Sequence, residues 1–225
     1  MPILYRFMDA ISALKSLSSL RLRVGRLASL NDPFDCAVHV RGTAPKEQAM
    51  YNDLGRALFD LRNKEVGVLC FSETWREPVL WSHYAARHEG LALCIRRDEG
   101  PDLLRVRYRS RRRCLSVSDF LTTVNKRRVM RAFTESFFTK SITWSYEREC
   151  RIIVALSDCD YIGGAYYTRI PPRAVAGVIL GLRCTTSPEE IHEVLQIVGV
   201  PRAKIWRATR ASSGYSLGRV RVREE

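Results

Sequence analysis

The sequence of 225 residues contains no apolar run long enough to cross a lipid bilayer. Its longest uninterrupted apolar stretch, residues 174–182, has nine residues, whereas a membrane-spanning helix needs roughly 20. The N-terminal residues, MPILYRFMDA, also lack the basic region and the apolar stretch of a secretory signal. We therefore expect no membrane-spanning helix and no export signal.

Cysteine pairs at metal-binding or redox spacing are also absent. The seven cysteines are an odd number, and no two of them are separated by only two residues. This pattern fits neither a disulfide framework nor a zinc ribbon. Several cysteines lie in apolar runs, where a thiol usually serves as a small buried hydrophobe. The cysteine usage favours a reduced, cytoplasmic protein.

Lysine is scarce, and acidic residues are too few to balance arginine. The chain has six lysines against 31 arginines, and its 37 basic and 24 acidic residues give a formal net charge of +13. A guanidinium group can donate two hydrogen bonds to one phosphate. The excess therefore favours an anionic partner, either nucleic acid or a phosphorylated cofactor. A GC-rich genome would explain the arginine codons but not the net excess.

Common nucleotide, hydrolase and metal motifs are missing. No Walker loop, G-x-G-x-x-G loop or G-x-S-x-G elbow occurs. His83 and His88 are five residues apart on a predicted helix, whereas two zinc ligands on one helix are typically about four apart. No metal site is predicted.

Hydrophobic periodicity predicts helices and strands in an irregular order, without repeats or domain linkers. The predicted helices cover residues 9–18, 45–63, 78–88, 126–138 and 188–198. The predicted strands cover residues 20–24, 66–71, 91–95, 150–156, 175–180, 204–208 and 217–222. Because strands and helices do not alternate regularly, we predict an α+β fold in a single domain spanning residues 1–225.

Glu147 and Glu149 form a candidate catalytic pair. They stand two residues apart at the start of a predicted strand, so their side chains share one face. Two carboxylates at one edge can accept hydrogen bonds from sugar hydroxyls and orient a nucleophile. The alternative is a solvated set of ion pairs with Arg148 and Arg151, which would contribute little to stability.

Arg6, Trp81 and Tyr84 are candidate ligand-binding residues. Arg6 lies between two aromatic residues at the start of a further strand, at the N-terminus, and can bind a phosphate or a hydroxyl. Trp81 and Tyr84 share one face of a predicted helix and can stack on a planar ring. The alternatives are an ordinary surface arginine and an aromatic pair in the core.

Five motifs occur in a characteristic order and spacing. They are LYRF (4–7), LNDPFD (30–35), VLCFSE (68–73), W-x-H-Y-A (81–85) and W-x-Y-E-x-E-x-R (144–151). This series resembles that of a large prokaryotic family that is catalogued only as a domain of unknown function, whose members often lie near phage-defence genes. The resemblance implies a defence effector or toxin with an antitoxin or defence protein as its partner.

Several of the same segments are similar, more distantly, to consecutive elements of the ADP-ribosyltransferase superfamily. Residues 4–7 are similar to its first strand and residues 13–22 to the helix and strand that follow. Three further segments, 66–72, 81–84 and 90–93, are similar to a strand–helix–strand block, and 147–153 to a strand that opens with E-x-E. The resemblance implies a split mixed β-sheet with flanking helices.

The same resemblance implies an enzyme that transfers ADP-ribose from NAD, without a metal. It assigns Glu149 to the nicotinamide ribose and to the charge that develops as nicotinamide leaves. It assigns Glu147 to the acceptor and Tyr84 to stacking on the nicotinamide ring. The other residues that it assigns to NAD binding are Arg6, Tyr5, Asn31, Ser72, Trp81 and His83.

An arginine-rich segment is the candidate nucleic-acid-binding surface. Its six arginines are Arg105, Arg107, Arg109, Arg111, Arg112 and Arg113, and a predicted helix adds Lys126, Arg127, Arg128 and Arg131. Both segments can bring a nucleic-acid acceptor to the site. The alternative is a solvated, charged edge strand that prevents aggregation.

Two other functions compete with ADP-ribosyl transfer. The first is a nucleic-acid-binding or nucleic-acid-cleaving defence protein, in which Glu147, Glu149 and Asp32 would hold a divalent metal ion. The second is a non-catalytic interaction module, which needs only the basic surface.

Overall fold

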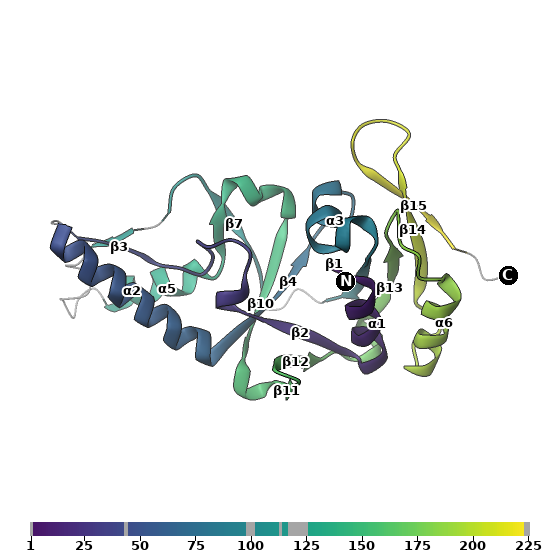
Figure 1. Cartoon of the computed structure of the whole chain (residues 1–225), viewed down its shortest axis with the longest axis horizontal. Coiled ribbons are helices and arrows are strands. Elements are labelled where there is room, and N and C mark those ends of the chain that lie inside the picture. The colour runs from purple at the N-terminus through teal and green to yellow at the C-terminus, as the bar shows by residue number, and fades with distance from the viewer. Residues whose placement is uncertain (1, 43–44, 98–101, 113, 117–125, 223–225) are drawn as a thin grey trace.

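A computed structural model describes residues 2–42, 45–97, 102–112, 114–116 and 126–222 (Figure 1). A large mixed β-sheet runs through the middle of the molecule. In spatial order its strands are β11 (Asp160–Ile162), β12 (Ala165–Arg169), β2 (Arg21–Arg26), β4 (Val66–Ser72), β1 (Ile3–Met8), β5 (Leu91–Arg96), β13 (Val175–Leu180), β14 (Lys204–Arg210) and β15 (Leu217–Arg221). In addition, β10 (Glu149–Ala155) pairs with β4 and with β6 (Leu103–Arg105).

Helices flank this sheet, and two small sheets lie beside it. The helices are α1 (Ala10–Ser19), α2 (Pro45–Glu65), α3 (Pro78–Tyr84), α5 (Lys126–Ser136) and α6 (Pro188–Ile197). The small sheets pair β3 (His39–Arg41) with β8 (Cys114–Ser116), and β7 (Arg107–Arg109) with β9 (Thr139–Ser141). The predicted α+β class is confirmed.

The sheet divides at β4. Strand β10 pairs with β4 from Ala155↔Val66 to Glu149↔Ser72, and so covers one edge of β4 along its whole length. On the other edge, β1 pairs at Tyr5↔Ser72 and β2 pairs at Gly25↔Val68. Strands β1 and β2 therefore diverge from a shared neighbour and leave a gap beside the middle of β4.

The two faces of the sheet carry different helices. On one face α1 and α6 pack through Leu17 and Leu195 onto strand residues such as Leu93 and Val178, which form the largest core. On the other face α3 packs through Trp81, which is fully buried, against a second core. Because side chains alternate along a strand, the central strands contribute to both faces.

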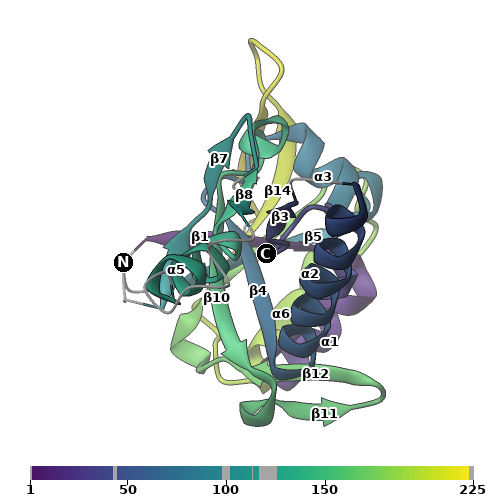
Figure 2. The ribbon, with the colours of Figure 1, turned by 90° about the vertical axis from the view of Figure 1, so that its left-hand side faces the viewer.

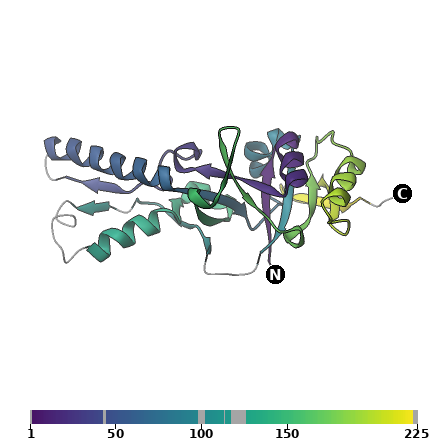
Figure 3. The ribbon, with the colours of Figure 1, turned by 90° about the horizontal axis from the view of Figure 1, so that it is seen from below.

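Helices α2 and α5 lie together at the end of the molecule opposite α6 (Figures 1 and 3). The Arg62 guanidinium of α2 donates a hydrogen bond to the Phe133 carbonyl of α5 and lies 3.7 Å from the Phe137 ring centroid. Seen end-on, these two helices lie on opposite sides of β4 and β10 (Figure 2). No helix in the described part of the chain is long and apolar enough to span a membrane.

Most predicted helices and strands are confirmed, and local chemistry explains where they begin and end. Asp9 caps α1 by accepting a hydrogen bond from the Ser12 N–H, and Ser187 caps α6 in the same way. The helix predicted over residues 78–88 is too long, since α3 ends at Tyr84. Residues 86–88 have positive φ angles between 45° and 73°, which a continuous α-helix does not allow. They form a separate turn with left-handed backbone angles.

Candidate functional site

A cavity of about 260 Å³ lies on the α3 face of the sheet, next to the gap between β1 and β2. Strands β1, β4 and β10, the segment that follows β2, helix α3 and strand β9 all contribute to its walls. Its polar lining includes Tyr5, Arg6, Ser29, Asn31, Asp35, Ser72, Tyr84, Lys140, Glu147, Glu149 and Arg151. Seven of the nine residues predicted to be catalytic or to bind NAD line this cavity, and these seven are Tyr5, Arg6, Asn31, Ser72, Tyr84, Glu147 and Glu149.

Strand register brings distant residues into one row. Tyr5 of β1 and Glu149 of β10 are both direct partners of Ser72 of β4, on its two edges. Paired residues project to the same side of a sheet, so all three side chains line the cavity. The Ser72 hydroxyl donates a 2.6 Å hydrogen bond to the Glu147 carbonyl. This bond fixes the turn that carries Glu147.

Five ionisable groups are buried together in this cavity. They are the two cations Lys140 and Arg151 and the three carboxylates of Asp35, Glu147 and Glu149. With all five ionised, two positive charges face three negative ones, and the cluster carries one net negative charge. A buried charge persists only when it is paired and hydrogen-bonded, which the geometry of this cluster provides.

Arg151 is the centre of the cluster and is completely buried. Its Nη1 and Nη2 atoms donate to the two Asp35 oxygens at 2.8 and 2.7 Å. Its Nε and Nη2 atoms donate to the two Glu149 oxygens at 2.7 and 2.8 Å. The predicted alternative was a solvated set of ion pairs with Arg148 and Arg151. It is wrong because the pair between Arg151 and Glu149 is buried. Arg151 pairs in the interior, and Arg148 is exposed.

Lys140 links the two glutamates. Its Nζ atom lies 2.6 Å from Glu147 Oε2 and 3.4 Å from Glu149 Oε2. An ionised carboxylate can accept about four hydrogen bonds, so Glu147, which accepts from Lys140 and Tyr84, keeps acceptor capacity for a ligand hydroxyl.

The environments of Glu147 and Glu149 shift their pKa values in opposite directions. Burial raises the pKa of Glu147 above its usual range, and the attraction of Lys140 only partly offsets this. Burial also opposes ionisation of Glu149, but the Arg151 guanidinium outweighs it and holds the pKa of Glu149 below its usual range. Carboxylates whose pKa values are pushed apart are suited to separate roles, one as an acid or base and one as a fixed anion.

Tyr84 and Asn31 close one side of the cavity. The Tyr84 hydroxyl donates a 2.5 Å hydrogen bond to Glu147 Oε1 and accepts one of 2.5 Å from the Asn31 amide. Burial and the bond to Glu147 raise the pKa of Tyr84, so it stays a neutral donor. Glu147 is thus held by Lys140 at one oxygen and by Tyr84 at the other.

Arg6 spans the gap in the sheet. Its Nη2 atom donates a 2.6 Å hydrogen bond to the Arg23 carbonyl of β2, which ties β1 to β2. Its Nη1 atom is buried and has no hydrogen-bond partner in the described part of the chain. Burial lowers the pKa of Arg6. A buried N–H group without a partner costs stability, so this donor suits a ligand oxygen in the cavity.

Two residues predicted to bind NAD lie elsewhere. Trp81 is fully buried on the sheet side of α3, where its indole N–H bonds the Trp75 carbonyl and its ring meets Phe7 edge-on. The alternative, a core aromatic, is the correct interpretation for Trp81. His83 is exposed and lies with Trp144 and Tyr146, outside the cavity lining. Trp81 and Tyr84 are three residues apart on α3, but Trp81 packs into the core while the Tyr84 hydroxyl reaches Glu147.

The arginine-rich segment does not form one strand. Arg105 ends β6 and pairs with Glu73 at 2.6 Å, while Arg107 and Arg109 belong to β7. Arg111 and Arg112 follow in a loop, and Arg112 lies 4.9 Å from the Phe34 ring centroid. Arg127, Arg128 and Arg131 are exposed on α5. Arg113 and the side chain of Lys126 lie outside the described residues.

The metal ligand set that the nuclease prediction requires is not assembled. Asp35, not Asp32, joins Glu147 and Glu149, and the space between these carboxylates is filled by Lys140 and Arg151. Asp32 instead accepts a hydrogen bond from the Phe34 N–H. In the ranges that the structure describes, no group of three His, Cys, Asp or Glu side chains is placed to hold a metal ion.

Sequence reasoning missed two members of the cluster. Asp35 closes the LNDPFD motif, but its carboxylate was given no role. Lys140 carries no local signal at all, because only the fold brings β9 beside the start of β10.

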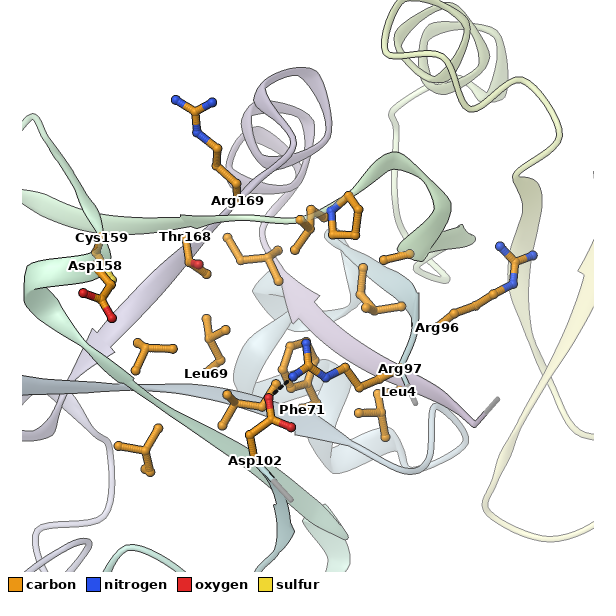
Figure 4. A pocket seen from close by; sticks show the side chains of 18 of the residues that line it. Leu4, Leu69, Phe71, Arg96, Arg97, Asp102, Asp158, Cys159, Thr168 and Arg169 are labelled. Atoms are coloured by element: carbon orange, nitrogen blue, oxygen red, sulfur yellow. Dashed lines mark hydrogen bonds and ion pairs between the residues drawn. The ribbon is translucent and has the colours of Figure 1, made fainter. Parts of the chain in front are cut away.

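A larger cavity of about 700 Å³ lies on the opposite face of the same strands (Figure 4). Its floor is apolar and includes Leu4, Leu69 and Phe71, and its rim carries Arg96 and Arg169. Arg97 at the rim pairs with Asp102. That ion pair is partly exposed, whereas the smaller cavity holds five ionisable groups buried together, so the smaller cavity is the stronger candidate for catalysis.

Comparison of the chain with protein-family models, with curated proteins and with solved structures gives no match.

Proposed function

We propose that the protein is an NAD-dependent ADP-ribosyltransferase whose reaction takes place in the cavity between Arg6, Tyr84 and Glu149. The observation that carries the proposal is the convergence of these three residues, from β1, α3 and β10, on one cavity that also holds Glu147. The motif resemblance supports a toxin or phage-defence effector as its biological role.

The volume of the cavity indicates that only part of the dinucleotide fits inside it. Sites for whole drug-sized ligands typically measure roughly 300–1,000 Å³, and this cavity has about 260 Å³. We assign the nicotinamide and its ribose to the cavity, and the rest of the dinucleotide to its mouth. Tyr84 offers an aromatic face to nicotinamide, and the unpartnered Nη1 of Arg6 offers a donor to a ribose or phosphate oxygen.

The reaction needs an anion beside the ribose and a base beside the acceptor. The bond between ribose C1′ and the nicotinamide nitrogen breaks, and its electron pair leaves with nicotinamide. The ribose then carries positive charge, which the Glu149 carboxylate stabilises because it is already ionised and fixed by Arg151. An acceptor lone pair forms the new bond to C1′, and Glu147 takes the acceptor proton.

The wild-type protein is expected to release nicotinamide from NAD without added metal. The measurement is chromatography of nicotinamide and ADP-ribose after incubation with NAD labelled in the adenosine half, in EDTA and again in Mg²⁺. Label transferred to DNA, RNA or protein identifies the acceptor. Mg²⁺-dependent cleavage of nucleic acid with no NAD turnover would instead favour the nuclease function.

The pH profile is expected to report Glu147. A general base must be deprotonated, and burial raises the pKa of Glu147. The transfer rate should therefore fall as the pH drops through a value above the usual glutamate range. Glu147→Gln should lower transfer by about 10²–10⁴-fold and remove this acidic limb. An unchanged profile in the variant would show that another group titrates.

A further inference from the structure

Three aromatic rings gather beside the cavity and take no part in the proposed reaction. His83 comes from α3, and Trp144 and Tyr146 come from η4 (Ile142–Glu147). Their ring centroids lie between 6.1 and 6.5 Å apart, and none of the three is fully buried. We call these residues the aromatic cluster.

The aromatic cluster adjoins the catalytic groups directly. The Nζ atom of Lys140, which holds Glu147, lies 4.6 Å from the Trp144 ring centroid. Tyr146 immediately precedes Glu147, and His83 immediately precedes Tyr84. A planar group that stacks on this cluster would therefore lie next to the base.

Guanidinium groups lie beside the aromatic cluster and on a strand that packs next to it. A separate hollow is lined by Tyr146 together with Arg76 and Arg148, both of which are exposed. In addition, β7 packs against η4. The Tyr108 hydroxyl of β7 accepts a hydrogen bond from the Glu149 N–H, so strand alternation directs the exposed Arg107 and Arg109 to the other face of β7, away from Glu149.

We propose that the acceptor is single-stranded nucleic acid, with one base stacked on the aromatic cluster and with flanking phosphates bound by Arg76, Arg148, Arg107 and Arg109. Aromatic faces combined with a basic surface are the physical requirements for binding unpaired bases and their backbone. A duplex hides its base faces, and an acidic peptide would leave the rings unused. The net charge of +13 favours a polyanion and does not distinguish DNA from RNA.

This inference rests on the proposed function for its chemistry. The lone pair of a base nitrogen forms the bond to ribose C1′, the electron pair of the broken glycosidic bond leaves with nicotinamide, and the N–H proton passes to Glu147. Binding alone requires none of these steps, so it can be tested separately.

The test is fluorescence anisotropy with labelled 12-nucleotide single-stranded DNA and RNA of mixed sequence, without NAD. Trp144→Ala and Tyr146→Ala should each weaken binding by about 5- to 150-fold, while Tyr161→Ala, which removes an exposed ring on β11, should not. The tighter binder of the two identifies the acceptor as RNA or as DNA, and either result supports the proposal.

Salt dependence tests the arginines. Arg107→Gln/Arg109→Gln should reduce the slope of log affinity against log salt by about 1.4, roughly 0.7 for each lost phosphate contact. The control Arg173→Gln/Arg202→Gln removes the same charge from exposed positions on the far side of the sheet and should leave the slope unchanged. Melting curves establish that every variant is folded.

Equal or tighter binding of the matching duplex would overturn the proposal, as would full competition by polyglutamate. Unchanged affinity in both aromatic variants would also overturn it. Nicotinamide release without oligonucleotide binding would refute the inference and leave the proposed function standing. Oligonucleotide binding without NAD turnover would refute the proposed function and leave standing only the binding of single-stranded nucleic acid.

Discussion

Glu149→Gln is expected to lower nicotinamide release from NAD by about 10²–10³-fold. The substitution keeps the shape of the side chain and one of its two hydrogen bonds from Arg151, but it removes the negative charge that faces the ribose. Glu149 is ionised because Arg151 holds its pKa below the usual range, so the lost interaction is electrostatic. Loss of an oriented charge matters most in a cavity that excludes water. The measurement is a steady-state assay of nicotinamide at saturating NAD.

Two variants separate this chemical effect from structural damage. Asp35→Asn removes the other carboxylate from Arg151, so it should destabilise the fold to a similar degree but slow the reaction much less. Glu193→Gln, at an exposed position of α6, should change neither stability nor rate. If Asp35→Asn and Glu149→Gln slow the reaction equally, Glu149 supports the cavity and does not act on the substrate.

The sequence predicted best those helices that begin at a capping residue and those strands that are apolar throughout. Asp9 and Ser187 mark the starts of α1 and α6 because a short polar side chain can bond the first free N–H groups of a helix. Strand β13 was recognisable because its six residues are apolar and buried on both faces. Strands β7, β8 and β9 have three residues each. A segment of that length shows no periodicity, and its pairing depends on distant residues.

The candidate site was predictable only where its residues belong to motifs. Arg6, Tyr84 and the glutamates occur in recognisable motifs. The register of β1, β4 and β10 brings Arg6 and the glutamates together, and α3 adds Tyr84. Lys140 has no such context, and its role follows from three-dimensional contacts alone. The resemblance implies a split sheet but does not place the division at β4, because no sequence pattern shows which two strands share one edge.

Arg151→Met is expected to destabilise the protein by about 3–5 kcal/mol. Methionine fills much of the same space, but it leaves Asp35 and Glu149 buried without the guanidinium that bonds all four of their oxygens. Lys140 can compensate only part of that charge, since it also holds Glu147. The measurement is the urea midpoint of unfolding at pH 7, with Arg148→Met as the control. Arg148 is exposed, so the control should stay within about 0.5 kcal/mol of the wild type.

The pH dependence of this loss identifies its cause. In the wild type, Arg151 holds the pKa of Glu149 below the unfolded value, so this pair stabilises the fold above that value and the contribution is lost as the pH falls. In Arg151→Met, burial acts without the guanidinium and raises the same pKa, so protonation on acidification relieves the unpaired charge. The difference in stability between wild type and variant should therefore shrink from pH 7 to roughly pH 5. A difference that stays constant over this range would show that the loss comes from packing, because the transfer of a methionine side chain has no proton linkage. The same arrangement that fixes Glu149 as an anion for the proposed reaction would then contribute to stability only by filling space.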